Sequence, residues 1–207
     1  IDELLVDCSD GQKDVLKQQF IDKGITIPQN LIIVGTVNMD ETTFSFSRKV
    51  LDRAMTIEMN EVDLYGGLTS RHEQIGKLNF EDLVGDKVEG VDVYQENQEV
   101  CNQAILYLQE INAVLEGTPF KIAYRTRNEF LLYVVNNLPY RKNSQGLEMT
   151  QNEVVARALD EITSMKILSR IEGDEEKIKA ELLASLKEVV SKMLPENMRD
   201  SSVSLAK

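Results

Sequence analysis

The sequence predicts an α+β fold that is mostly α-helical: a partial parallel α/β core of about two strands, followed by a helical bundle. Two observations support this prediction. The run from Leu31 to Val34 is the only unbroken aliphatic stretch that suits a fully buried strand. From residue 61 onward, strand patterns fade and apolar residues recur at helical spacing. We therefore expect the core in residues 1–60, the helical domain in 61–195 and a frayed tail in 196–207.

The first part of the chain alternates between helix and strand patterns. A helix is expected over Gln12–Lys23, because Gly24 suits its C-terminal stop. The strand at Leu31–Val34 is followed by a polar turn, a short helical pattern near Val50 and a second strand over Met55–Met59. Ligands of parallel α/β sheets bind at the carboxyl ends of strands, so the polar turn is the expected place for chemistry.

The later part of the chain predicts a series of helices. Apolar spacing is most regular over Gln95–Glu116, which Gly117 and Pro119 should end. A capping box, in which Thr150 and Glu153 satisfy each other's backbone N–H groups, marks the start of another helix. The expected helices are Glu61–Lys77, Gln95–Glu116, Tyr124–Asn137, Thr150–Met165 and Glu175–Met193.

Composition excludes several classes of protein. The formal net charge is −12, from 23 basic and 35 acidic residues, which disfavours a broad nucleic-acid-binding surface. No apolar run approaches the ~18 residues that a membrane span needs, and no cationic, hydrophobic signal segment is present. These features predict a cytoplasmic protein without a membrane partner.

Metal and triad chemistry are not expected. His72 is the only histidine, and Cys8 and Cys101 are isolated thiols without metal-ligand spacing. Two reduced cysteines in a cytosolic protein explain this pattern better than a disulfide or a metal pair. We therefore predict no metal site made by this chain alone.

The polar residues that could contact a ligand each allow two interpretations. Position alone favours Asn38 as a turn residue; the alternative is a side chain that holds a water or a phosphate oxygen. For Arg53 the alternatives are a surface salt bridge and a contact to a phosphate on a neighbouring subunit. Arg125 and Arg127 begin a helix, where cations oppose the helix dipole, so they either meet a phosphate or pair with Glu129 or another acidic residue.

The stretch NLIIVGTVNMDETTFSFSRKVLDRAMTIEM resembles the segment from sensor 1 to the arginine finger in AAA+ nucleotidases of the McrB type. The family pattern is P-x-N, aliphatic residues, G-T-x-N-x-D, and then S-P-K-V-L-D-R-A. Arg48 replaces the usual Pro, which only presets the first helical turn. Later, Tyr124-Arg125 is similar to the sensor-2 entry of the family's helical lid. The run from Lys166 to Asp174 looks like its K-I-L-P-x-I-x-G-D element, with Ser169 in place of Pro.

This resemblance implies roles for the arginines and Asn38. Asn38 would be sensor 1 and Arg53 the arginine finger, and these are the predicted catalytic residues. Arg125 would be sensor 2, and Arg125 and Arg127 are the predicted cofactor-binding residues. The fold implied is a partial AAA+ core followed by a helical lid. The implied cofactor is ATP or GTP with Mg²⁺ in the intact parent protein.

The phosphate-binding half of such a nucleotidase is missing from the sequence. No G-x-x-x-x-G-K-[ST] motif occurs, and the resemblance of Asp2-Glu3 to a Walker B end is better explained by chance than by a displaced remnant, because the preceding aliphatic residues are missing. We therefore expect the C-terminal part of a McrB-like module from a DNA restriction system, inactive alone and with no nucleotide bound. The expected partners are a homo-oligomeric ring, a McrC-like nuclease subunit, and DNA through other parts of the parent.

Two alternatives remain. The acidic amphipathic helices suit a non-enzymatic protein-interaction module. Two structural findings would favour this alternative: no sheet around Leu31–Val34, and side chains of Asn38, Arg53 and Arg125 that point away from one another. A nuclease would need acids such as Asp40 and Glu41, but no D…ExK arrangement accompanies them.

Overall fold

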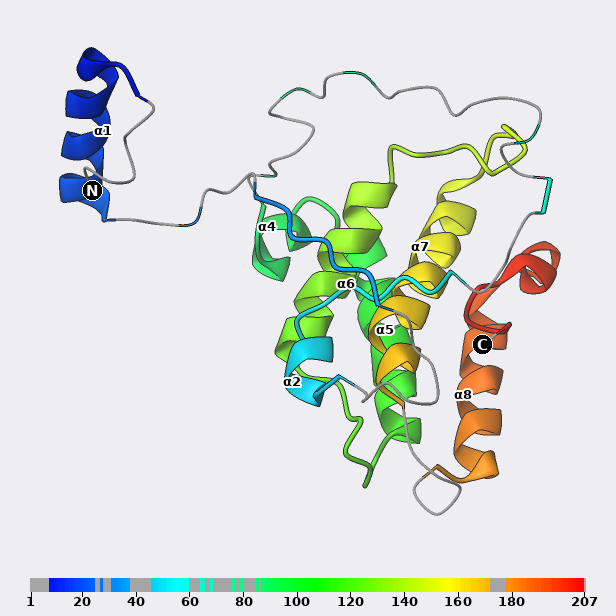
Figure 1. Cartoon of the computed structure of the whole chain (residues 1–207). Helices are drawn as coiled ribbons and strands as arrows, with labels where there is room; N and C mark the ends of the chain where they lie inside the picture. Colours follow the sequence, from blue (N-terminus) through cyan, green and yellow to red (C-terminus); the bar gives the residue numbers. More distant parts are fainter. Residues whose placement is uncertain are drawn as a thin grey trace. The chain divides into compact units, whose positions relative to one another are not determined.

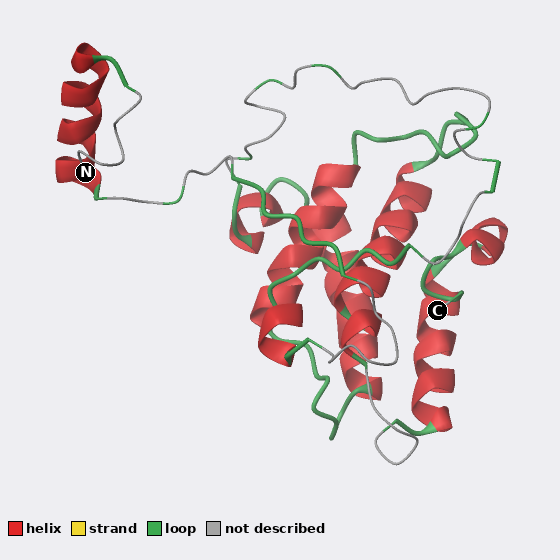
Figure 2. Ribbon diagram, viewed as in Figure 1, coloured by secondary structure: helices red, strands yellow, loops and turns green. Residues whose placement is uncertain are grey.

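The computed structural model is mostly helical (Figures 1 and 2). It divides into two compact units, which are treated separately below: Ile1–Asn38 with Glu73–Gly85, and Met39–His72 with Asp86–Lys207. The structure describes residues 8–24, 27, 31–37, 46–59, 64, 65, 68, 76, 79, 85, 87–171 and 178–206.

The first unit contains α1, Asp10–Lys23, which confirms the predicted first helix. Its start is stabilised by Gln12, whose Oε1 accepts a hydrogen bond from the Ser9 N–H at 3.4 Å. It ends at Gly24, which adopts φ +76° and donates from its N–H to the Phe20 carbonyl at 2.9 Å. A left-handed φ at this position explains the glycine stop.

The predicted strand at Leu31–Val34 is wrong for this structure. Residues 31–37 have no regular secondary structure, and Ile33 is 85% exposed. A strand requires a neighbouring backbone to pair with, and residues 31–37 find none within the described ranges. The second predicted strand, Met55–Met59, is also absent; there the Thr56 N–H points to the Met165 carbonyl at 3.4 Å. The α/β part of the predicted core is therefore not supported, whereas the mostly α prediction is confirmed.

The second unit consists of helices. The short helix α2 comes first. The helices predicted at Gln95–Glu116, Tyr124–Asn137 and Thr150–Met165 are all confirmed, and their ends differ from the prediction by a few residues at most. The last predicted helix is confirmed over its described portion. The elements are α2 Arg48–Leu51, α4 Gly90–Tyr94, α5 Gln98–Val114, α6 Tyr124–Asn137, α7 Gln151–Lys166, η2 Leu168–Arg170, α8 Ala180–Met193 and η3 Glu196–Ser201.

The capping box at the start of α7 forms as predicted. The Thr150 N–H donates to Glu153 Oε2 at 2.8 Å, and the Glu153 N–H donates to Thr150 Oγ1 at 3.3 Å. The hydrogen bonds to the Glu153 carboxylate hold its pKa below its usual range, because they stabilise the charged form. This start fixes which face of α7 turns toward the core.

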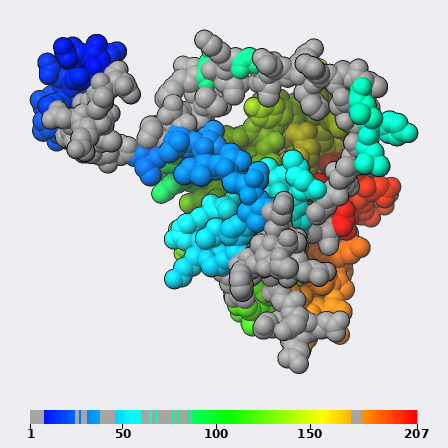
Figure 3. All heavy atoms as spheres, in the orientation of Figure 1, coloured from blue at the N-terminus to red at the C-terminus, as the bar shows by residue number. Residues whose placement is uncertain are grey.

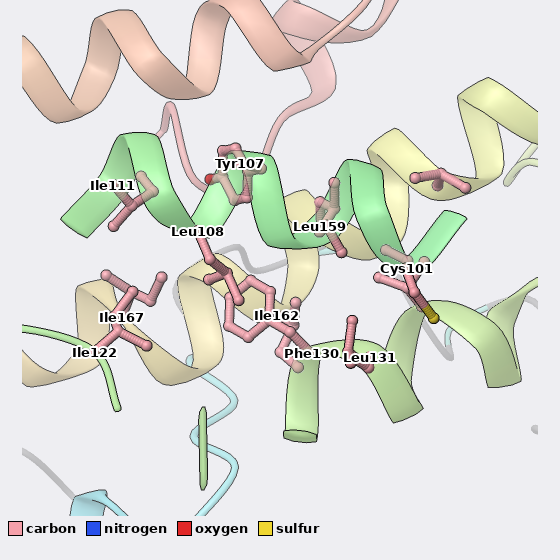
Figure 4. Close-up of a cluster of buried hydrophobic side chains, with 14 of the residues drawn as sticks. Cys101, Tyr107, Leu108, Ile111, Ile122, Phe130, Leu131, Leu159, Ile162 and Ile167 are labelled. Atoms are coloured by element: carbon pink, nitrogen blue, oxygen red, sulfur yellow. The ribbon is translucent and has the colours of Figure 1, made fainter. Parts of the chain in front are cut away.

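The core joins α5, α6, α7 and α8 in one cluster of buried apolar side chains (Figure 4). Ile111, Phe130 and Ile162, one from each of α5, α6 and α7, are fully buried. A polar contact lies inside it: the Tyr107 hydroxyl and Thr163 Oγ1 are 2.8 Å apart. Burial raises the pKa of Tyr107, so this hydroxyl remains protonated. The bundle therefore forms a rigid support for the loops at its surface.

The segment predicted as a frayed tail is ordered through residue 206. It begins with η3, and Ser202 and Ser204 are buried. The reason is Asp160, a buried residue of α7 that accepts hydrogen bonds from Ser202 Oγ at 2.6 Å and from the Val203 N–H at 2.9 Å. Sequence periodicity cannot reveal this contact, because Asp160 and its partners are distant along the chain.

Some predictions lie outside the described residues. These are most of the helix expected at Glu61–Lys77, and the polar turn that contains Asn38, Asp40 and Glu41. Among the helices that are described, none has both the length and the apolar character needed to cross a membrane.

Candidate functional site

An open pocket of about 440 Å³ brings together two of the predicted site residues, Arg53 and Arg125. They come from segments that lie far apart in the sequence: Arg53 follows α2, and Arg125 lies in the first turn of α6. The pocket is built within the second unit. The remaining lining residues are Val88, Glu89, Asn128, Glu129 and Leu132.

Arg53 is exposed in the turn that ends α2. Its Nη1 donates to the Lys49 carbonyl at 2.8 Å, which satisfies one of the carbonyls left without an intrahelical partner at the end of the helix. The predicted alternative, a surface salt bridge, does not form with any residue in the described ranges. A guanidinium has five N–H donors, so donors remain for a ligand. Leu51, the last residue of this short helix, is buried.

Arg125 is also exposed and lies close to the N-terminus of α6. It does not pair with Glu129, nor with any other carboxylate among the residues that the structure describes. A cation at this end of a helix opposes the helix dipole. Both arginines thus bring positive charge to the pocket, in a chain whose net charge is −12.

Arg127 is directed elsewhere. Its Nε and Nη2 donate to Asn128 Oδ1 at 3.2 and 2.8 Å. Its guanidinium lies 5.0 Å from the centre of the Tyr124 ring, within the range of a cation–π contact. Arg127 does not line the pocket, although it holds Asn128, which does. Asn38, the predicted sensor 1, lies outside the described residues.

The wall formed by Val88 and Glu89 is fixed by Asp92 of α4. Asp92 Oδ2 accepts hydrogen bonds from the Val88 and Glu89 N–H groups at 2.9 and 2.8 Å. These backbone hydrogen bonds, from Glu89 first, hold the pKa of Asp92 below its usual range. The carboxylate therefore stays ionised at neutral pH and keeps this side of the pocket in place.

The role of Lys166 is what the sequence analysis missed, because the sequence shows this residue only as the start of a run that resembles a lid element. It is the last residue of α7 and is completely buried. Its Nζ donates to the carbonyls of Asp52 at 3.1 Å and Ala54 at 2.9 Å. The sequence signal was the resemblance of Lys166–Asp174 to the K-I-L-P-x-I-x-G-D element, which begins with this lysine.

Glu129 supplies the counter-charge to Lys166. Glu129 Oε2 lies 2.9 Å from Lys166 Nζ, yet this buried oxygen accepts no hydrogen bond from the described residues. The distance is that of an ion pair and the angles are not those of a hydrogen bond, so we treat the contact as charge compensation. One of the two acids lining the pocket is thereby neutralised.

The described residues do not include a cluster of three or more His, Cys, Asp or Glu side chains that could hold a metal ion. The pocket thus suits an anion better than a cation, because its exposed charged donors are guanidinium groups.

The fold and the pocket together define a mostly helical domain that presents two arginines on one surface. Residues 79–207 match the family model described as "Domain of unknown function (DUF8727)". The match covers more than half of the chain, so the chain belongs to this family. Comparisons with curated proteins and with solved structures found no match.

Proposed function

We propose that this chain supplies arginine contacts to the polyphosphate of a nucleotide, as the C-terminal part of an AAA+ nucleotidase of the McrB type. The observation that supports the proposal is the convergence of Arg53 and Arg125 on one pocket. Guanidinium groups stabilise the charge that develops during phosphoryl transfer. The sequence resemblance implies that both residues contact nucleotide phosphates, and their position at one pocket agrees with that role.

A second polypeptide region supplies the phosphate cradle, because this sequence contains no Walker A motif. In the proposed assembly, subunits form a ring, and Arg53 meets the γ-phosphate held by its neighbour. Arg125, the sensor-2 residue that the resemblance implies, responds to the γ-phosphate from α6. The cofactor is ATP or GTP with Mg²⁺, and hydrolysis drives work on DNA together with a McrC-like nuclease subunit.

The test asks whether this chain restores hydrolysis to a partner subunit that lacks its own arginine finger. The chain is mixed with a McrB-type subunit that has an intact Walker A motif but alanine in place of its own finger arginine, and ATP and GTP hydrolysis are measured. The natural chain should raise the rate, and Arg53→Ala should remove most of the rise, on the scale of about 10³-fold for a finger arginine.

The matched control is Arg199→Ala, which removes an equal charge from an exposed position in η3. This variant should stimulate as well as the natural chain. No stimulation at any mixing ratio, or equal stimulation by the Arg53 variant, contradicts the proposal.

A non-enzymatic interaction module is the second candidate. The observation that favours it is the exposed run at Leu31–Val34, which pairs with no other described segment, where a nucleotidase core would have a buried strand. This candidate predicts that the mixture co-elutes in size-exclusion chromatography while the rate of hydrolysis stays at the value of the partner alone.

A further inference from the structure

The side chain of Lys166 connects the two segments that carry the pocket arginines. On one side its Nζ donates to the carbonyls of Asp52 and Ala54, the residues directly before and after Arg53. On the other side it pairs with Glu129, which lies one helical turn after Arg125 on α6. A single buried ammonium group therefore contacts the backbone of one arginine segment and the helix of the other.

Neighbouring contacts strengthen the same connection. Arg170 Nη2 lies 2.8 Å from Asp52 Oδ1, and the Met165 carbonyl faces the Thr56 N–H at 3.4 Å. The end of α7 and the turn after it thus contact the segment 52–56 from several directions. In the space-filling view, residues near 50 (cyan) lie on the surface (Figure 3).

Burying a lysine for stability alone is inefficient. A buried charge must be compensated, and an apolar side chain of similar volume often stabilises a fold as well or better. Buried charged groups are instead suited to specifying one arrangement of the segments that they join. The two main-chain acceptors of Lys166 define a position of the backbone, because a carbonyl is present whatever the side chain.

We propose that Lys166 is a positioning residue that sets Arg53 at a fixed distance from Arg125 across the pocket. This inference rests on the proposed function for its effect on hydrolysis, but its geometric part stands alone. Loss of the ammonium group releases the turn at 52–54, so that Arg53 no longer stays beside Arg125. Without this fixed spacing the two arginines no longer act together on bound phosphate, so they accelerate hydrolysis less.

The geometric test measures the distance between the two segments. Spin labels are placed at Val50→Cys in α2 and Tyr124→Cys in α6, two exposed positions, in a Cys8→Ser background; the buried Cys101 remains unlabelled. Pulsed electron paramagnetic resonance should give a narrow distance distribution in the natural background. Lys166→Met should broaden it, and Lys187→Met in α8, an exposed lysine, should not.

Lys166→Met leaves the buried oxygen of Glu129 without its counter-charge, so it could prevent folding. A second variant, Lys166→Met with Glu129→Gln, removes both charges and keeps the side-chain volumes close to the original. Its α-helical circular dichroism and cooperative unfolding confirm that the bundle is intact. The distance distribution should still be broad, because the contacts to the carbonyls of Asp52 and Ala54 are lost.

The functional arm is a double-mutant cycle in the complementation assay. Lys166→Met with Glu129→Gln should lower the stimulated kcat by about 10²-fold, the scale of a misplaced catalytic group, with little change in the KM for nucleotide. In the Arg53→Ala background the same change should have no further effect, since Lys166 acts through Arg53. A purely structural role would instead give losses that multiply.

The outcomes separate the two ideas. An unchanged distance distribution, or losses that multiply, overturns the positioning role of Lys166. A broadened distribution together with no effect of Arg53→Ala on hydrolysis overturns the proposed function, while the link between the two segments stands.

Discussion

Among the described residues of the second unit, two charged side chains are buried, Asp160 and Lys166, and each is bound by main-chain groups from a distant part of the chain. Lys166 donates to the carbonyls of Asp52 and Ala54, and Asp160 accepts from the N–H groups of Val203 and Ser204. Opposite ends of the chain's second unit are thereby attached to α7. The partners are backbone atoms, so these contacts specify where each segment lies.

The Glu153 carboxylate predicts a pH dependence of stability. Hydrogen bonds from Thr150 lower its folded-state pKa, so it stabilises the fold fully above the pKa of the unfolded chain. This contribution is lost as the pH falls through the folded-state value. In urea unfolding, Glu153→Gln should therefore be less stable than the natural chain at neutral pH, and the difference should shrink in acid.

The control for this prediction is Glu196→Gln, which removes an exposed carboxylate from η3. A difference between Glu153→Gln and the natural chain that is independent of pH would show that the carboxylate contributes nothing through its charge.

Residue-level prediction from sequence succeeded where the interaction is local. The capping box joins Thr150 to Glu153, three positions away, and was identified from their spacing. The contacts of Lys166 join residues 114 and 112 positions apart. No local pattern encodes such a contact, so the positioning role of Lys166 required the structure.

At the scale of elements, Gly90 sets how closely α4 approaches α6. A Cβ at this position would lie 2.8 Å from Asn128 Oδ1 and 3.0 Å from Leu131 Cδ1. Both distances are shorter than an ordinary contact, so only glycine fits without movement. Asn128 also lines the pocket and accepts a hydrogen bond from Arg127, so a shift of the Asn128 side chain would change the candidate site.

Gly90→Ala should therefore destabilise the protein by about 1 kcal/mol, the lower end of the usual cost of overpacking, because the atoms that a Cβ would meet are the ends of the Asn128 and Leu131 side chains. Thermal unfolding measures this change. The matched control is Gly11→Ala in α1, where a Cβ meets nothing within 4 Å, and this variant should be neutral or slightly stabilising. Equal behaviour of the two variants would contradict the close approach of α4.

Helices and strands differed in how well the sequence predicted them. Each helix satisfies its hydrogen bonds within its own segment, so apolar spacing and caps found α5, α6 and α7. A strand satisfies them only through a neighbour. Leu31–Val34 has strand-like composition but no pairing partner in the described ranges, and composition could not reveal that absence.

For the whole molecule, the exposed aliphatic run at Leu31–Val34 predicts self-association. These side chains are between 53% and 85% exposed, and unpaired backbone beside them can add strands between molecules. Ile33→Lys should reduce the apparent mass in sedimentation velocity and slow the growth of light scattering on warming. Gln19→Lys in α1 makes a comparable addition of charge at an exposed position and should change neither.

Reversed outcomes would point to a different surface. If Gln19→Lys suppresses association as well as Ile33→Lys does, the run at Leu31–Val34 is not the surface responsible; repulsion cannot explain that result, because an added lysine lowers the magnitude of the net charge of −12.

The contact between Asp160 and the tail also decides how the bundle would respond to a mechanical load. Ser204 Oγ donates to the Asp160 carbonyl at 2.6 Å, and the Asp160 carboxylate holds the neighbouring N–H groups. A pulling force applied at residue 206 would therefore load the middle of α7 before it loads α8, although α8 is nearer along the chain. The hydrogen bonds around Asp160 would carry this load first, so their rupture should be the first event in a force-extension trace.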